Sequence, residues 1–148
     1  MRILLVNGPN LNLLGQREPE IYGTATLEDH VESATKRAAE HGLDLDHLQS
    51  NHEGEIVDAI QAARTTHDAI VINPGAFSHY AWSIHDALAS FDGPVVEIHI
   101  SNANAREPWR HTSVVSPVAT GSIMGFGGRS YTLAIDAVAG LLDKGMQP

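Results

Sequence analysis

The chain contains no cysteine among its 148 residues. Disulfide bonds, a thiol nucleophile and a cysteine-ligated metal are therefore excluded. The chain also has no apolar run near the roughly 18 residues that a transmembrane helix needs, and its apolar N-terminal segment is too short for a signal peptide. From these absences we expect a cytosolic protein, and from its length we expect one domain that spans residues 1–148.

Basic residues are scarce, because nine lysines and arginines stand against eighteen acidic residues and the formal net charge is −9. Proteins that bind phosphate backbones or anionic membranes carry the opposite balance, so we expect neither as a partner. The lysines are Lys36 and Lys144, and neither lies near a predicted site, which argues against Schiff-base chemistry. Neither a P-loop nor a GxGxxG string follows the first apolar segment, so we expect no nucleotide cofactor.

Segments typical of strands and of helices alternate along the chain. The first, third and fourth strand segments are continuous apolar runs, as in strands buried on both faces, whereas the second alternates like an edge strand. Thr26 with Asp29 resembles a helix start, and the glycine-rich stretch 121–128 resembles a connection. The predicted strands are residues 2–7, 44–50, 69–73, 95–100 and 113–116, and the predicted helices are residues 27–41, 55–65, 80–90 and 129–144.

Repeated β-α units predict an α/β fold in which helices cover both faces of a parallel sheet. Five strands with an edge-like second strand fit the flavodoxin-like order 2-1-3-4-5. Ligands of such sheets bind beyond the carboxyl ends of the strands, at the switch point between the first and third. The loops that begin at Asn7, Asn73 and His99 should therefore line one crevice.

Two of these loops carry candidate acid-base groups. Arg17 precedes Tyr22 by five residues, and an adjacent guanidinium favours the ionised form of a phenol, which would make Tyr22 a base. Glu97 and His99 are two apart on a strand and share one face, where a carboxylate orients an imidazole as a general acid. This pair could also be a structural hydrogen bond or part of a zinc site, but no HxH or HxxxH spacing lies beside it.

Other loop residues could bind an anion or a hydroxyl group. The segment from Asn73 to His79 offers amide and backbone donors, or else it is only a turn followed by a helix cap. Arg106 and Arg110 offer guanidinium forks that match a carboxylate, or else they belong to a solvated charged loop. With Asn10 as a further amide donor, the set fits removal of a proton next to a carbonyl and loss of a β-hydroxyl as water.

Two rival functions fit parts of the same pattern. One is a flavin-binding or phospho-signalling module of the same fold, and the other is a different lyase or isomerase acting on hydroxylated cyclic acids. Asn7 and Asn10 occupy the region where a response regulator needs acidic residues and where a flavodoxin needs a phosphate loop.

The chain resembles the type II 3-dehydroquinate dehydratases over essentially its whole length, through four motifs in the same order and spacing. The motifs are NGPNLNLLG at 7–15 followed by Arg17 and Tyr22-Gly23, SNHEGE at 50–55, NPGA at 73–76 with His79 and Asp86, and EIHISN at 97–102 with Ala105-Arg106-Glu107 and Arg110-His111.

This resemblance implies reversible dehydration of 3-dehydroquinate to 3-dehydroshikimate by anti elimination through an enolate, without a metal or organic cofactor, in the shikimate pathway or in quinate catabolism. It implies that Tyr22, with Arg17 beside it, removes the proton, and that Asn10 stabilises the enolate. His99, held by Glu97, would protonate the departing hydroxyl. The substrate-binding residues that the resemblance implies are Asn73, Gly75, His79, Asp86, Ile100, Ser101 and Arg110.

The resemblance also implies a homododecamer, a tetramer of trimers in which Asp86 reaches the site of a neighbouring subunit. Three residues depart from the family's pattern, namely His85 before Asp86, Asn104 before Ala-Arg, and Trp109 in place of phenylalanine. None has a proposed catalytic role, although His85 lies near the implied subunit contact.

Overall fold

The computed structural model describes residues 1–16 and 18–144, except for the side chain of Tyr22. Its middle layer is a parallel sheet in the order β2-β1-β3-β4-β5, as the sequence predicts. The strands are β1 (Arg2–Asn7), β2 (Asp44–Gln49), β3 (Ala69–Asn73), β4 (Val95–His99) and β5 (Gly121–Met124).

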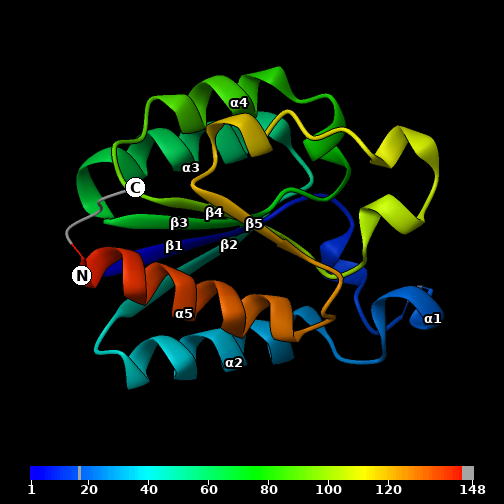
Figure 1. Ribbon diagram of the computed structural model, residues 1–148, viewed down its shortest axis with the longest axis horizontal. Coiled ribbons are helices and arrows are strands. Elements are labelled where there is room, and N and C mark those ends of the chain that lie inside the picture. The colour runs from blue at the N-terminus through cyan, green and yellow to red at the C-terminus, as the bar shows by residue number, and fades with distance from the viewer. Residues whose placement is uncertain (17, 145–148) are drawn as a thin grey trace.

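Helices cover both faces of the sheet (Figure 1). Helices α2 (Leu27–Glu40) and α5 (Arg129–Asp143) pack on one face, and α3 (Glu53–Thr66) and α4 (Trp82–Ala89) pack on the other. A short helix that the sequence pattern did not predict, α1 (Pro19–Tyr22), lies in the loop after β1. No helix in the described part of the chain is long and apolar enough to cross a membrane.

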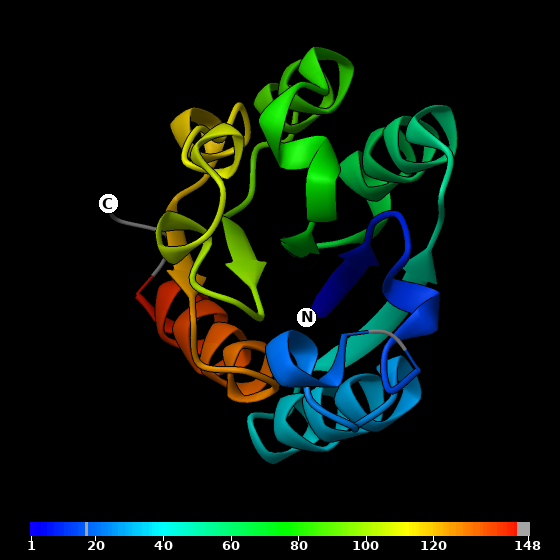
Figure 2. The ribbon, with the colours of Figure 1, turned by 90° about the vertical axis from the view of Figure 1, so that its right-hand side faces the viewer.

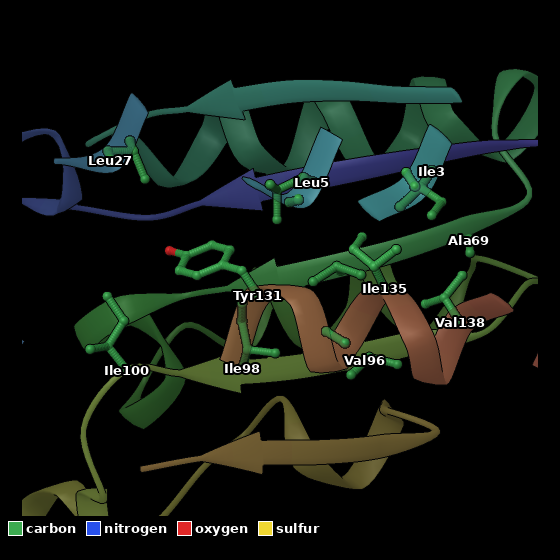
Figure 3. Close-up of a cluster of buried hydrophobic side chains, with 14 of the residues drawn as sticks. Ile3, Leu5, Leu27, Ala69, Val96, Ile98, Ile100, Tyr131, Ile135 and Val138 are labelled. Carbon is green, nitrogen blue, oxygen red and sulfur yellow. The ribbon is translucent and has the colours of Figure 1, made fainter. Parts of the chain in front are cut away.

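Alternating side chains of the central strands supply both core layers. Ile3 and Leu5 of β1 face α2 and α5, whereas Leu4 and Val6 face α3 and α4, and all four are buried. Tyr131 of α5 lies among the aliphatic side chains of the first layer (Figure 3). Burial of each such Leu, Ile or Val side chain contributes about 1.5–3 kcal/mol to the free energy of folding.

Helix α2 begins where the sequence predicts a helix start, and Thr26 and Asp29 form a capping box there. The Asp29 N–H donates to Thr26 Oγ1 over 3.2 Å, and the Thr26 N–H donates to Asp29 Oδ2 over 2.9 Å. Both backbone donors would otherwise lack a partner within the helix. These hydrogen bonds hold the pKa of Asp29 below its usual value. The start of α2 is therefore fixed locally, immediately after the loop that carries α1.

The prediction of the fifth strand was wrong. Residues 113–115 form an irregular turn, Ser116 begins a short 3-10 helix (Ser116–Val118), and β5 lies instead in the glycine-rich stretch predicted to be a connection. Val114 and Val115 are buried like strand residues, but Ser113 Oγ accepts the N–H groups of Val115 and Ser116, which turns the backbone. The edge strand β5 is short and half-exposed, so its sequence carries little apolar pattern.

The carboxyl ends of β1 and β3 meet closely. Asn7 pairs with Asn73, and the Gly8 N–H donates to the Asn73 carbonyl oxygen over 2.8 Å. A Cβ atom on Gly8 would lie 2.4 Å from the Pro74 carbonyl oxygen, so no side chain fits there. The loops after β1, β3 and β4 consequently lie around the same end of the sheet (Figure 2).

We predict that Gly8→Ala lowers the free energy of unfolding by about 1–3 kcal/mol, because the new methyl group forces the two loops apart. Urea denaturation measures the change. Gly54→Ala is the matched control, since an added Cβ there meets no atom within 4 Å and the site lies in α3. The control should be neutral or more stable by up to about 1 kcal/mol. Equal stability of the two variants would contradict the prediction.

Candidate active site

A cavity of about 80 Å³ lies at the carboxyl ends of β1, β3 and β4, where the sequence predicts a crevice. All three predicted loops contribute to it. Its lining consists of Pro9, Asn10, Leu11, Asn73, Gly75, Ala76, His79, His99, Ile100, Ser101, Ala103, Arg106 and Arg110.

The predicted pair of Glu97 and His99 forms beside this cavity. His99 Nε2 lies 2.8 Å from Glu97 Oε2, and Glu97 is wholly buried. Because an ionised carboxylate only accepts hydrogen bonds, Nε2 carries the proton of this contact. Nδ1 is then the ring nitrogen that His99 offers to a ligand in the cavity.

Glu97 remains ionised although it is buried. Burial raises the pKa of Glu97, but the hydrogen bond and charge of His99 and the hydroxyl groups of Ser116 and Ser113 outweigh burial and hold it below the usual value. The carboxylate can therefore stabilise positive charge on the His99 ring.

His79, unlike His99, is held as a hydrogen-bond acceptor. Its Nδ1 lies 2.7 Å from the Thr112 carbonyl oxygen, which can only accept, so Nδ1 carries the proton and Nε2 is an acceptor. Burial lowers the pKa of His79, and the neighbouring charges of His99 and Arg110 lower it further. His79 is thus a neutral acceptor near pH 7, suited to a hydroxyl group of a ligand.

The two arginines of the loop after β4 both line the cavity. Arg106 Nη1 donates to Ser101 Oγ over 3.1 Å, and Arg110 Nε donates to Glu107 Oε2 over 3.0 Å. The Arg110 guanidinium also lies over the indole of Trp109, 4.0 Å from the ring centroid. Both arginines were candidates from the sequence, although the family resemblance implies only Arg110 as a substrate-binding residue, and the structure brings both to the cavity.

The amide of Asn73 is shared between the cavity and the core. Its Nδ2 donates to the Tyr131 hydroxyl over 3.1 Å, and its Oδ1 accepts the Gly75 N–H over 3.3 Å. The Tyr131 hydroxyl in turn donates to Asn7 Oδ1 over 2.6 Å. Burial raises the pKa of Tyr131 far above its usual value, so the phenol stays neutral. This chain of hydrogen bonds ties together the ends of β1 and β3.

Asn10 and Gly75 give the cavity wall its backbone shape. Asn10 adopts the left-handed conformation with φ of 66°, which asparagine tolerates, and its N–H donates to Asn51 Oδ1 over 2.9 Å. Gly75 has φ of 56°. At the end of β4, Gly125 and Gly127 donate to the carbonyl oxygens of His99 and Ile100, which fixes the backbone beside Ser101.

Some predicted residues are not brought to this cavity. Asp86 is exposed on α4 and lies outside the cavity lining. Arg17 and the side chain of Tyr22 lie outside the described residues, so their predicted roles stay predictions. Among the departures from the family's pattern, Trp109 supports Arg110, and His85 Nδ1 lies 2.6 Å from the Val114 carbonyl oxygen.

The structure also shows two features that bear on the alternatives. Within residues 1–16 and 18–144, no three His, Asp or Glu side chains gather closely enough to hold a metal ion. A larger hollow of about 530 Å³ lies between the loop after β1 and α2. The smaller cavity is the better candidate, because only there does a buried carboxylate hold an imidazole beside two arginines.

Proteins of known name resemble the chain over most of its length. A family model described as "Dehydroquinase class II" matches residues 1–139. The 3-dehydroquinate dehydratase of Roseiflexus castenholzii is 50% identical over 145 residues, 98% of this chain and 92% of that protein. The catabolic 3-dehydroquinase of Penicillium rubens is 55% identical over 136 residues, 92% of this chain and 88% of that protein. Among solved structures, the type II dehydroquinase of Propionibacterium acnes has a TM-score of 0.91 at 45% identity, covering 94% of this chain and 96% of that one.

We predict that Tyr131→Phe lowers the free energy of unfolding by about 1–3 kcal/mol, because Asn7 Oδ1 loses its buried donor. Thermal or urea denaturation measures this loss. Tyr80→Phe is the control, since Tyr80 is 58% exposed and its change should stay within about 0.5 kcal/mol. Similar losses in both variants would contradict a special role for the buried phenol.

Glu97→Gln should change the pH dependence of stability. The folded chain holds the pKa of Glu97 below its ordinary 4.5, so the ionised group stabilises the fold above that pH. This stability is lost as the pH falls through the lowered pKa of the folded state. The variant has no such proton to bind, so the stability gap between the wild type and Glu97→Gln should be largest near neutral pH and narrow in acid. Urea denaturation over a pH series tests this, and a constant gap would contradict it.

Proposed function

The chain belongs to the class II dehydroquinase family and is a hydro-lyase that dehydrates 3-dehydroquinate, and we propose that it does so by anti elimination through an enolate. The observation that carries the mechanism is the buried Glu97 holding His99 at a cavity that two arginines also line. Relatives named for catabolism and relatives without that label are about equally similar, so the reaction serves the shikimate pathway or quinate catabolism.

His99 is the proposed acid. It would give the proton at Nδ1 to the β-hydroxyl as the C–O bond breaks, so that the oxygen leaves as water with the bonding electron pair. The enolate electrons then form the new C=C bond and restore the ketone, which gives 3-dehydroshikimate. The negative charge of Glu97 supports the protonated ring before transfer, and the neutral tautomer that remains is the one that donates from Nε2 to Glu97.

The proposed base is Tyr22, made acidic by Arg17, and this assignment rests on the sequence motif. The phenolate would remove the proton from the carbon next to the ketone, and the enolate that forms would be stabilised from the side of Asn10, which lines the cavity. Solvent then returns the proton from the phenol to the imidazole, which resets both groups.

Substrate binding is assigned to the remaining groups of the cavity wall. Neutral His79 would accept a hydrogen bond from a substrate hydroxyl, while Asn73, Gly75, Ile100 and Ser101 supply polar groups beside it. Arg110 would bind the substrate carboxylate as a bidentate fork. Its present partner Glu107 is half-exposed, and a surface ion pair is worth only about 0–1 kcal/mol, so the ligand can compete for the guanidinium.

The wider setting of the site also belongs to this proposal. We infer that residues 1–148 act as one catalytic domain in the cytosol and need no cofactor. We also infer a homododecamer built from trimers, in which Asp86 contributes to a neighbouring subunit's site. The exposed position of Asp86 on α4, away from the cavity of its own chain, supports such a contact.

We predict that Tyr22→Phe lowers kcat by about 10²–10⁴, the usual effect of losing a general base. The conjugated enone product absorbs in the near ultraviolet, so an absorbance assay with 3-dehydroquinate follows turnover directly. Tyr80→Phe is the matched control and should leave kcat close to the wild-type value. Turnover of Tyr22→Phe within a few-fold of the wild type would remove this residue from the mechanism.

A further inference from the structure

We propose that Ser113, Ser116 and Ser122 are positioning residues for the dehydration, because together they fix the carboxylate that aims the ring of His99. The inference rests on the proposed role of His99 as the acid. None of the three serines lines the cavity, and they act on the substrate only through Glu97 and His99.

The carboxylate receives four donors on its two oxygens. Glu97 Oε2 accepts from His99 Nε2 and from Ser113 Oγ, each over 2.8 Å. Glu97 Oε1 accepts from Ser116 Oγ over 2.5 Å and, more weakly, from Ser122 Oγ over 3.4 Å. The carboxylate plane is therefore held from both sides, which sets the direction in which Oε2 receives the imidazole.

The hydroxyl of Ser113 has only one direction for its proton. Its oxygen accepts the backbone N–H groups of Val115 and Ser116, each over 3.1 Å. Both N–H groups belong to a turn that the buried side chains of Val114 and Val115 anchor in the core. The proton of Ser113 consequently points at Glu97, and this donor is fixed before any ligand arrives.

Neutral donors suit this task better than a cation would. A lysine or arginine beside Glu97 would neutralise the carboxylate and weaken its pull on the positive charge of the imidazolium. Hydroxyl groups satisfy the oxygen lone pairs and leave the full negative charge to act on His99. His79, which also lines the cavity, senses this charge as well, because Glu97 raises its pKa.

The arrangement also separates Glu97 from water. Ser116 and Ser122 are exposed residues, whereas Glu97 directly beneath them is wholly buried. Their hydroxyl groups take the place that solvent would otherwise occupy. Water in that place would be free to rotate, and the imidazole would lose its fixed orientation.

The test uses Ser113→Ala, Ser116→Ala and the double variant, with Ser130→Ala as the matched control. Ser130 is wholly buried near His99 but donates to the His99 carbonyl oxygen instead of to Glu97. We expect the double variant to lower kcat by roughly tenfold or more, with KM changed much less. Carbon-13 NMR of labelled glutamate should show that the pKa of Glu97 rises in it, because hydroxyl donors hold it down.

Ser116→Thr is a further check that should fold like the wild type, since position 116 is exposed and threonine keeps a hydroxyl group. It should retain most of the activity and the lowered pKa of Glu97. Nitrogen-15 spectra of the histidines, recorded where the His99 ring is neutral, should show its proton on Nε2 in the wild type and a mixture of tautomers in the double variant.

Two outcomes separate this inference from the proposed function. If the double variant matches Ser130→Ala in kcat, in the pKa of Glu97 and in the His99 tautomer, the inference is overturned while the dehydration mechanism stands. If His99→Gln keeps wild-type turnover, the acid assignment fails, and the catalytic part of the serine inference fails with it.

Discussion

The buried negative charge of Glu97 determines how the groups of the site are arranged. Glu97 is ionised without access to water, and an isolated buried carboxylate would cost several kcal/mol. His99 of β4 contributes most to its stabilisation, and further donors come from the turn at 113–116 and from β5. The segments beside β4 therefore supply hydrogen-bond donors to Glu97, and Glu97 in turn orients the ring of His99.

The sequence could predict the parts of the fold whose signal is local. The apolar runs of β1, β3 and β4 and the helix start at Thr26 show in the residues themselves, and both agree with the structure. The fifth strand could not be found in this way. Val114 and Val115 have the apolar character of strand residues, but the Ser113 hydroxyl accepts the Val115 N–H and turns their backbone. The strand β5, which does pair with β4, consists of residues with almost no apolar pattern.

The site, like the fold, has parts that the sequence predicts and parts that only the structure shows. The pairing of Glu97 with His99 follows from a spacing of two on a strand, and the topology brings the loops with Asn73 and Arg110 to that point. The serines around Glu97 and the inward turn of Arg106 depend on contacts between segments that are far apart in the sequence or on the conformation of one loop. No spacing rule reports such contacts, and only the folded chain shows them.

The stacking of Arg110 on Trp109 has a practical consequence. The chain has two tryptophans. Trp109 has a guanidinium over its face and a perpendicular ring contact with His79, whereas Trp82 lies on α4 against His85. An anion that draws Arg110 toward the cavity changes the electric field across that indole. The intrinsic fluorescence of Trp109 thus gives a label-free signal of occupancy, read against a steady background from Trp82.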